Sequence, residues 1–411
     1  MPPPEPPSRD PPELEAALAG VRVLDLATFI AAPFCATLMA EFGAEVIKIE
    51  HPEGGDPFRR FGSMTEAGDS LAWLSEARNK ESVTLNLKHP DGQDLLRRLV
   101  EGADVLCENF RPGTLERWGL GWQELSAINP GLVMLRITGY GQTGPYRDRP
   151  GFARTAHAFG GLTYLAGMPD GPPVTPGSTS LADYISGIYG AFGVMMALRV
   201  RERSGSGQVI DLALYESVFR LLDELAPAYA KFGTVRQPEG AGTANACPHG
   251  QFRCADGGWV ALACTSDKMF QRLASAMGRP ELAAPETYGE ARRRLDGREA
   301  VERLVGDWTG SLTRAEVLER CQAEEVPCSA VNSIADIFAD PQYRDRDNLV
   351  TLEDRVAGAV TVPGVVPRLS ATPGRIARLG PRLGEHNAEV YRRLLDLDDK
   401  AIARLKADGV I

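Results

Sequence analysis

The sequence predicts a doubly wound α/β fold, in which helices cover both faces of a mostly parallel sheet. Short apolar runs of strand-like composition alternate with helical patterns of about 10 to 15 residues, which is typical of successive strand–helix–strand units. The first 50 residues contain one such unit. With 411 residues, 43% hydrophobic and 24% charged, the chain has the composition of a globular protein of two or three domains. Ligands of doubly wound sheets bind beyond the carboxyl ends of the strands.

The expected elements follow in a regular order. Residues 21–26 form an apolar strand, and Pro33 lies in the first turn of the next helix, where its missing N–H costs nothing. Gly43 ends that helix. Further strands are expected at residues 45–50, 82–87, 103–108 and 132–137, and helices at 31–42 and 91–102. Residues 21–50 therefore form a βαβ unit with a parallel pair of strands.

A long apolar helix is expected around and after Asp183. Hydroxyl side chains at residues 178–180 can cap its free N–H groups, and its basic last turn, residues 199–203, faces the negative end of the helix dipole. Asp183 then lies in the first turn, where the helix N-terminus is expected to hold its carboxylate ionised. An ionised carboxylate is what a nucleophile needs. The alternative is that Asp183 only caps a helix.

Residues 139–144 match the dinucleotide-binding pattern G-x-G-x-x-G by letter and follow a strand. The next six residues, 145–150, include two prolines and cannot open the helix whose N-terminus would hold a pyrophosphate. No acidic residue ends a following strand about 20 positions further on. We therefore expect no nicotinamide cofactor at this turn.

Charge and cysteine content exclude several classes of function. The net charge is −10 and no Lys/Arg run dominates a segment, which argues against nucleic-acid binding. The seven cysteines lack the short paired spacings of a zinc site, so no metal is expected, and their odd number indicates a reducing cytoplasm. Residues 1–13 are too rich in proline to pack and are expected to be disordered. No apolar run reaches the roughly 18 residues of a membrane span.

Several short motifs carry a resemblance to a known family. They are N-F-R-P-G and R-W-G-L at 109–113 and 117–120, G-Y-G-Q-T-G-P at 139–145, G-P-P at 171–173, A-D at 182–183 and R-L-G-E-H at 382–386. Together they resemble the class III CoA-transferase (CaiB/BaiF) family, which includes formyl-CoA transferases, carnitine CoA-transferases and α-methylacyl-CoA racemases. The resemblance covers nearly everything from about residue 19 to 411. In character it is nearest to succinyl-CoA:dicarboxylate CoA-transferases.

The resemblance implies a division of the chain that composition does not reveal. A disordered tail, residues 1–18, would precede a large Rossmann-like α/β domain that binds CoA, residues 19–228. A smaller α/β domain would be inserted at residues 229–330, with a strand at 259–264 and helices near 268–277 and 313–324. Residues 331–411 would return to the large domain. Two such chains interlock in the family, so the resemblance implies an interlocked homodimer.

The family position of the nucleophile falls on Asp183. The resemblance implies that its carboxylate attacks an acyl-CoA thioester and then carries CoA as an aspartyl thioester to an acceptor acid. The CoA thioester would be a substrate, and no tightly bound cofactor is expected. Gln142 is a second catalytic candidate, because its amide can donate to an oxyanion. Gly240 and Gly242 lie where the family often has a glycine-rich loop whose N–H groups serve the same purpose; the alternative is an ordinary surface loop.

CoA carries three phosphates and an adenine, so its site needs cations and an apolar face. Asn109, Phe110 and Arg117 match the stretch that contacts CoA in the family, with Phe110 supporting adenine or pantetheine and Arg117 a phosphate. Arg78 and Lys80 would add two cations. Outside the family context, these basic residues would be solvated surface charges.

Two positions depart from the family. His51 stands where some members have an Arg, and we include it in the expected CoA site. Ile30 stands where formyl-CoA transferases have Gln, which does not favour formyl or oxalate substrates.

The acceptor is expected to be a dicarboxylate such as malate, citramalate or glutarate, with succinyl-CoA as the donor. Arg154 or His157, just upstream of Asp183, would pair the second carboxylate. The alternative is that Arg154 faces solvent and His157 satisfies a core hydrogen bond.

Two other functions remain open from the sequence. One is a non-catalytic CoA-binding protein, against which the presence of Asp183 argues. The other is an α-methylacyl-CoA racemase, which needs an acid and a base on opposite faces of the α-carbon. The racemases carry a His where this chain has Phe152, and His157 lies five positions later, so it should point away. The sequence therefore favours CoA transfer.

Overall fold

The computed structural model describes residues 14–411. Residues 1–13, which were predicted to be disordered, lie outside the described residues, so this stays a prediction. The chain divides into two compact units, each described here by itself. Of the described residues, 14–161, 178–223 and 345–411 form the first unit, and 162–177 and 224–344 form the second. The functional domain boundaries expected at residues 18, 228 and 330 stay a prediction.

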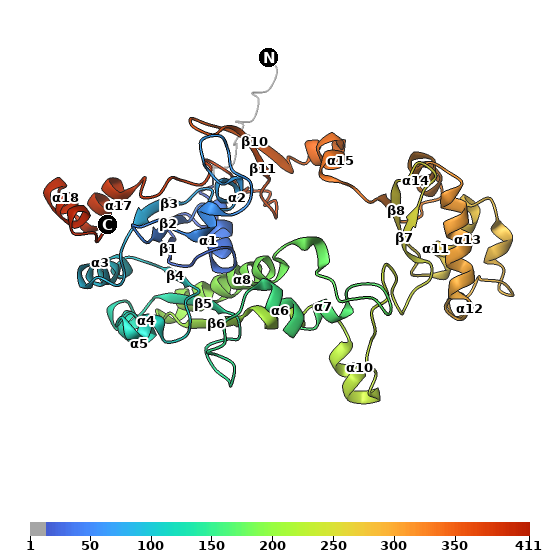
Figure 1. Ribbon diagram of the computed structural model, residues 1–411, viewed down its shortest axis with the longest axis horizontal. Coiled ribbons are helices and arrows are strands. Elements are labelled where there is room, and N and C mark those ends of the chain that lie inside the picture. The colour runs from blue at the N-terminus through green and yellow to red at the C-terminus, as the bar shows by residue number, and fades with distance from the viewer. Residues whose placement is uncertain (1–13) are drawn as a thin grey trace, which may run out of the picture. The chain divides into compact units, whose positions relative to one another are not determined.

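The first unit is built on a six-stranded parallel sheet with the order β3-β2-β1-β4-β5-β6 (Figure 1). Its strands are β1 (Arg22–Asp25), β2 (Glu45–Glu50), β3 (Glu81–Thr84), β4 (Val105–Glu108), β5 (Val133–Thr138) and β6 (Val209–Ala213). In register, Leu24 of β1 pairs with Ile47 on one side and Leu106 on the other. The strand order reverses between β1 and β4, which is the topological switch point of a doubly wound sheet. The predicted fold class is confirmed in this respect.

Helices of the first unit connect these strands. They are α1 (Ala31–Glu41), α2 (Leu71–Glu76), α3 (Pro90–Glu101), α4 (Thr114–Arg117), α5 (Trp122–Ile128), α6 (Ala153–Phe159), α8 (Leu181–Ser204) and α9 (Leu214–Phe219). The expected helix after Asp183 is α8, which leads from β5 back to β6. Gly187 lets α8 approach α1 closely, since a Cβ there would lie 2.8 Å from the Ala31 carbonyl oxygen. Such close packing fixes the helix that carries Asp183 against the sheet.

Helix α8 is also long and apolar enough to cross a membrane by length and composition, the one such helix in the described part of the chain. A buried core helix passes the same test. One side of α8 packs on α1, β5 and β6. The other side exposes large apolar side chains at spacings of one helical face: Ile188, Phe192, Met195, Met196 and Val200.

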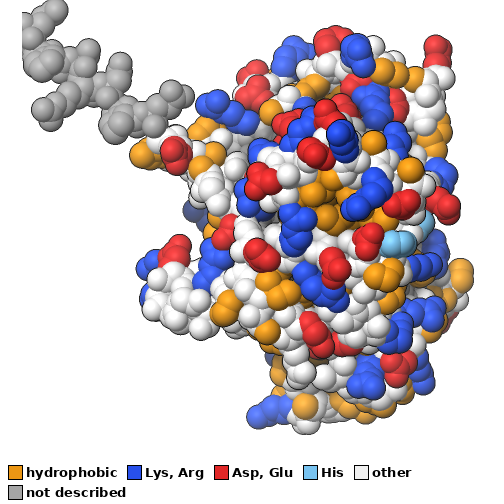
Figure 2. Space-filling view, turned by 90° about the vertical axis from the view of Figure 1, so that its left-hand side faces the viewer, with side chains coloured by type: hydrophobic (Ala, Val, Ile, Leu, Met, Phe, Trp, Pro, Cys, Tyr) orange, Lys and Arg blue, Asp and Glu red, His pale blue; other side chains and the backbone are white. Residues whose placement is uncertain are grey.

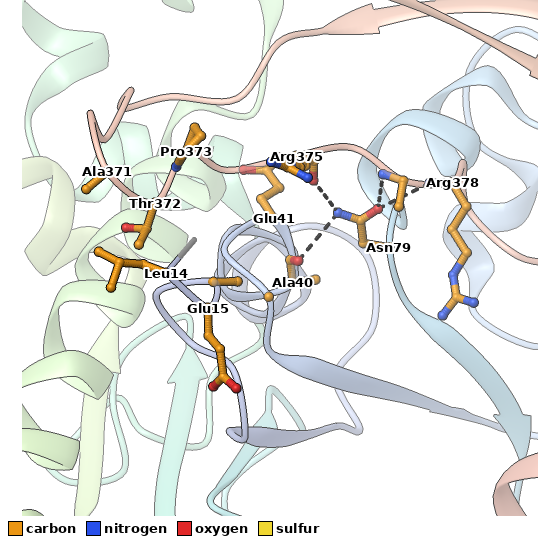
Figure 3. Close-up of a pocket in the computed structure, with 13 residues that line it drawn as sticks. Leu14, Glu15, Ala40, Glu41, Asn79, Ala371, Thr372, Pro373, Arg375 and Arg378 are labelled. Carbon is orange, nitrogen blue, oxygen red and sulfur yellow. Dashed lines mark hydrogen bonds between the residues drawn. The ribbon is translucent and has the colours of Figure 1, made fainter. Parts of the chain in front are cut away.

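The C-terminal segment of the first unit packs on β3 and α1. It contains β10 (Leu349–Asp354), β11 (Gly358–Pro363), α17 (Asn387–Leu395) and α18 (Asp399–Ala407). The Asn79 side-chain amide links this segment to α1. Its Nδ2 donates to the carbonyls of Ala40 and Arg375, and its Oδ1 accepts the N–H groups of Ala377 and Arg378 (Figure 3). Tyr391 adds a buried bond from its hydroxyl to the Thr84 carbonyl, 2.6 Å. These contacts span some 300 residues of sequence.

The second unit has its own antiparallel sheet in the order β7-β8-β9. The strands are β7 (His249–Arg253), β8 (Trp259–Ala263) and β9 (Cys328–Ala330). The helices are α7 (Leu162–Leu165), α10 (Leu225–Phe232), α11 (Asp267–Ala276), α12 (Ala291–Asp296), α13 (Arg298–Gly310), α14 (Arg314–Ala323), α15 (Ile334–Ala339) and α16 (Pro341–Asp345). Its apolar core is separate from that of the first unit. The expected strand and both expected helices of this region are present as β8, α11 and α14.

The surface carries both signs of charge. Figure 2 shows Lys and Arg side chains interspersed with Asp and Glu over the visible face, with small apolar areas between them. A mixed surface of this kind gives no extended positive field for a polyanion.

Candidate functional site

A cavity of about 210 Å³ lies at the switch point of the parallel sheet. Its walls come from the loops after β1, β4 and β5, from residues 147–152, and from Asp183 and Leu214. Asn109 joins the first two loops, because its Oδ1 accepts the Thr28 N–H at 2.9 Å and its Nδ2 donates to the Thr28 carbonyl at 2.7 Å. The cavity therefore lies where doubly wound folds bind ligands, and the structure brings Asn109, Phe110 and Asp183 together in it.

Asp183 is the third residue of α8 and is half-buried. Burial raises the pKa of its carboxyl group to about 7. This raised pKa corrects the expectation that the helix N-terminus keeps the carboxyl group fully ionised. The reason is that the N–H groups of the first turn donate to other acceptors. The N–H groups of Asp183 and Tyr184 both donate to the Ser180 carbonyl, and that of Ala182 donates to His157. Among the side chains that the structure describes, none makes a hydrogen bond to the Asp183 carboxylate, and loss of hydration outweighs the helix dipole.

The loop after β1 holds a strained residue against this cavity. Phe29 has φ of 62°, a region that bulky side chains rarely adopt. Asp56 Oδ1 accepts its N–H at 3.0 Å, and Asp56 in turn lies 3.0 Å from the buried Lys48 ammonium group. The Phe29 ring meets Phe152 edge-on at 6.1 Å between centroids. Backbone strain maintained by a buried ion pair is typical of a preformed ligand site.

A second cavity, of about 170 Å³, lies beyond the carboxyl ends of β1, β2 and β3. His51, Lys88, Phe110 and Trp118 line it, and Phe110 also lines the Asp183 cavity. The Phe110 and Trp118 rings meet at 73° with centroids 5.7 Å apart. Flat aromatic walls beside a cation suit a nucleobase and its phosphates. The structure thus brings the predicted residues His51 and Phe110 to one place.

Arg78 and Lys80 do not form part of either cavity. Arg78 is 5% exposed and pairs with Glu41, while Lys80 is 1% exposed, pairs with Asp25 at 2.9 Å and donates to the Pro33 carbonyl. Their charges are thus neutralised inside the protein, where a phosphate has no access. The structure corrects the expectation that these two residues face CoA.

Three other predicted residues lie outside the lining of the Asp183 cavity among the described residues. Arg117 is exposed and donates to the Thr114 hydroxyl at 3.0 Å. Arg154 is exposed on α6. The Gln142 backbone N–H donates to Asp211, and its side-chain nitrogen is buried without a hydrogen-bond partner in residues 14–411.

His157 is buried, with 1% of its surface exposed, and does not line the Asp183 cavity. Its Nε2 accepts the Ala182 N–H at 2.9 Å. Burial, with a smaller effect of the Arg154 charge, lowers its pKa. The structure corresponds to the alternative in which His157 satisfies a core hydrogen bond, and it corrects the expectation that His157 pairs a substrate carboxylate.

Gly240 and Gly242 belong to the second compact unit. Gly240 has φ of 63°, and its N–H donates to the Gly167 carbonyl at 2.8 Å. Gly242 lines a cavity of about 620 Å³ within that unit. Their expected part in oxyanion binding stays a prediction.

Two arginines that the sequence reading did not assign line the Asp183 cavity, namely Arg147 and Arg149. The Arg149 guanidinium lies 3.6 Å from the centroid of the Tyr146 ring, which restricts its motion. Both follow the glycine-rich turn after β5. Their position beyond the end of a strand could have identified them from the sequence, because ligands of this fold bind there.

The chain matches CoA-transferase family III over residues 18–387 and belongs to this family. It is a CoA-transferase, and enzymes of this class use CoA thioesters as substrates. No group of three or more His, Cys, Asp or Glu side chains in the described residues is arranged to hold a metal ion.

Named relatives support the same conclusion. The chain is 60% identical to the succinyl-CoA–L-malate CoA-transferase β subunit of Chloroflexus aurantiacus, over 96% of this chain and 98% of that one. It is 42% identical to the succinyl-CoA–D-citramalate CoA-transferase of the same organism, with the same coverage. A CaiB/BaiF family protein from Brucella suis has a similar crystal structure, with a TM-score of 0.82 and 33% identity over 93% of this chain and 100% of that one.

Proposed function

We propose that the protein transfers CoA from succinyl-CoA to a dicarboxylate such as malate, citramalate or glutarate, through a thioester on Asp183. The main support for this proposal is that the Asp183 carboxylate lines a cavity at the switch point and that burial raises its pKa to about 7. A more basic carboxylate is a better nucleophile, and half of it is ionised near neutral pH. The names of the relatives support the choice of donor and acceptor.

The reaction would proceed in two matched halves. An Asp183 oxygen attacks the thioester carbon of succinyl-CoA and the C–S bond breaks, so that CoA leaves as a thiolate and the succinyl group forms a mixed anhydride with Asp183. The thiolate then attacks the Asp183 carbonyl carbon, which releases succinate and leaves CoA on Asp183. The acceptor carboxylate takes CoA by the reverse steps, so the free Asp183 carboxylate is regenerated and no proton is consumed.

The substrate's second carboxylate would meet Arg147 and Arg149. These are the guanidinium groups that line the cavity with Asp183. Guanidinium pairs carboxylates in bidentate geometry, which favours a dicarboxylate over a simple fatty acid. The CoA nucleotide would occupy the neighbouring cavity, between His51, Phe110 and Trp118.

Racemisation is the less favoured alternative. Phe152 lines the Asp183 cavity, and no histidine of the described residues lines it. One carboxylate can attack a thioester, whereas racemisation needs a second proton-exchanging group across the α-carbon.

The functional unit would be an interlocked homodimer in the cytoplasm. The exposed apolar face of α8 supports an interface between chains, because Phe192 alone is 60% exposed there. The 60% identical relative is designated a β subunit, so pairing with a related second chain is the competing arrangement.

The function is tested by incubating the protein with a panel of acyl-CoA donors and carboxylates and detecting new thioesters by mass. We expect succinyl-CoA with malate, citramalate or glutarate to yield the corresponding CoA ester. In deuterated water, α-deuterium entering 2-methylacyl-CoA faster than CoA exchanges between acids would assign the racemase function instead.

A further inference from the structure

The N-terminus of α8 lacks a side-chain cap of its own. Its N-cap residue, Ser180, makes no capping bond through its side chain. The Ser180 carbonyl accepts the N–H groups of Asp183 and Tyr184 at 2.9 and 3.2 Å. The N–H of Ala182, a residue with no exposed surface, needs another acceptor, because a buried N–H without one is unfavourable.

His157 of α6 supplies that acceptor through Nε2, at 2.9 Å. A neutral imidazole that accepts at one nitrogen carries its proton on the other, so Nδ1 is an N–H donor. Within residues 14–411, Nδ1 is buried and has no hydrogen-bond partner. The hydrogen bond that Nε2 accepts from the Ala182 N–H is therefore the one hydrogen bond of this ring among the described residues.

This bond connects two walls of the cavity. Helix α6 begins directly after Gly151 and Phe152, which line the cavity, and Ala182 directly precedes Asp183, which lines it from another side. A side chain on α6 thus holds the backbone beside the reacting carboxylate. His157 itself does not line the cavity.

We infer that His157 is a positioning residue for CoA transfer, which accepts the Ala182 N–H and thereby holds the Asp183 carboxylate at a fixed place relative to the Phe152 wall. This inference rests on Asp183 being the nucleophile, as proposed above. It predicts that CoA transfer requires a hydrogen-bond acceptor at the position of Nε2 but does not require an imidazole ring. Glutamine places an amide oxygen at about the position of Nε2, so His157→Gln should retain the function that an apolar side chain loses.

The kinetic test compares His157→Gln with His157→Leu, and with His157→Met in case the leucine variant does not fold. We expect kcat to fall roughly 10- to 100-fold in the apolar variants, because small misplacements of reacting groups have effects of that size. KM for succinyl-CoA should change little, and His157→Gln should stay near the wild type.

His89 offers a matched control. Its Nδ1 accepts the Asp91 N–H at 3.2 Å at the start of α3, a helix that contributes no residue to either cavity. His89→Leu should lower the melting temperature without lowering kcat. Wild-type kcat in folded His157→Leu, or equal damage in the Gln and apolar variants, would overturn the inference.

Hydrogen exchange separates this inference from the proposed function. Peptides that cover residues 181–186 should exchange faster in His157→Leu than in the wild type and His157→Gln. Equal exchange in all three would overturn the inference even if CoA transfer is confirmed. If the wild type transfers no CoA, the proposed function fails, and the exchange pattern still decides whether His157 holds the first turn of α8.

Discussion

Asp183 shows how two opposing effects act on a single carboxyl group. The helix N-terminus favours its charged form, whereas burial in the cavity disfavours it. Burial prevails because the first-turn N–H groups are taken by Ser180 and His157, and the resulting pKa is about 7. The group is therefore half protonated at neutral pH and must lose its proton before it attacks a thioester.

The pH dependence of the first half-reaction follows from this pKa. A carboxyl group with a raised pKa is protonated below it, so the rate of thioester formation should fall as the pH drops through about 7 and level off above it. Single-turnover rates with succinyl-CoA between pH 5.5 and 8.5 measure this. A rate independent of pH over that range would contradict a buried, weakly acidic nucleophile.

Arg147 and Arg149 should determine selectivity for the second carboxylate. Replacing either by Met removes a charge-assisted hydrogen bond, so we expect KM for the dicarboxylate to rise roughly tenfold. Arg154→Met is the matched control, because Arg154 is exposed and outside the cavity lining. The inhibition constant of free CoA should stay unchanged; a parallel rise would assign these arginines to the CoA phosphates.

Among the strands and helices, the pattern of apolar residues predicted those elements whose bounds depend on the local sequence. The strand Glu45–Glu50 was predicted to the residue, and α1 and α3 to within one or two. Strand β6 was not predicted, because its apolar run of five residues is interrupted by Asp211 and continues directly into the apolar start of α9 at Leu214, so no turn residue marks where the strand ends.

The candidate site was predicted only in part, for a related reason. Asp183, Asn109 and Phe110 follow from motifs and meet in one cavity. Lys80 and Arg78 appear as available cations in the sequence. Their partners Asp25 and Glu41 lie 55 and 37 positions away, and only the fold reveals these pairs.

Asn79 offers a test of how distant elements are joined. Its amide makes four hydrogen bonds that hold residues 375–378 to the end of α1, and its φ is 63° (Figure 3). Asn79→Ala should lower the free energy of unfolding by about 2 kcal/mol or more, through lost bonds and an unfavourable φ. Asn79→Gly, which accepts that φ, should lose less. Urea unfolding measures both, and equal losses would mean that backbone strain is irrelevant here.

For the whole molecule, the exposed apolar face of α8 bears on assembly. We expect light scattering to give twice the 44.4 kDa chain mass, and Phe192→Glu to shift the protein toward a monomer, since a buried unpaired charge opposes association. Val356→Glu is the control, as Val356 is similarly exposed at 50% but lies between β10 and β11. A wild-type monomer would contradict the proposed dimer, and a dimer formed only with a related chain would favour a hetero-oligomer.

The covalent intermediate tests the central claim most directly. The protein is incubated with succinyl-CoA without an acceptor acid, and its intact mass is measured before and after hydroxylamine. We predict an adduct of one CoA per chain, located at Asp183 by peptide mapping and removed by hydroxylamine. Asp183→Ala should lose both the adduct and CoA transfer, whereas transfer that continues in Asp183→Ala, or an adduct on another residue, would contradict the mechanism.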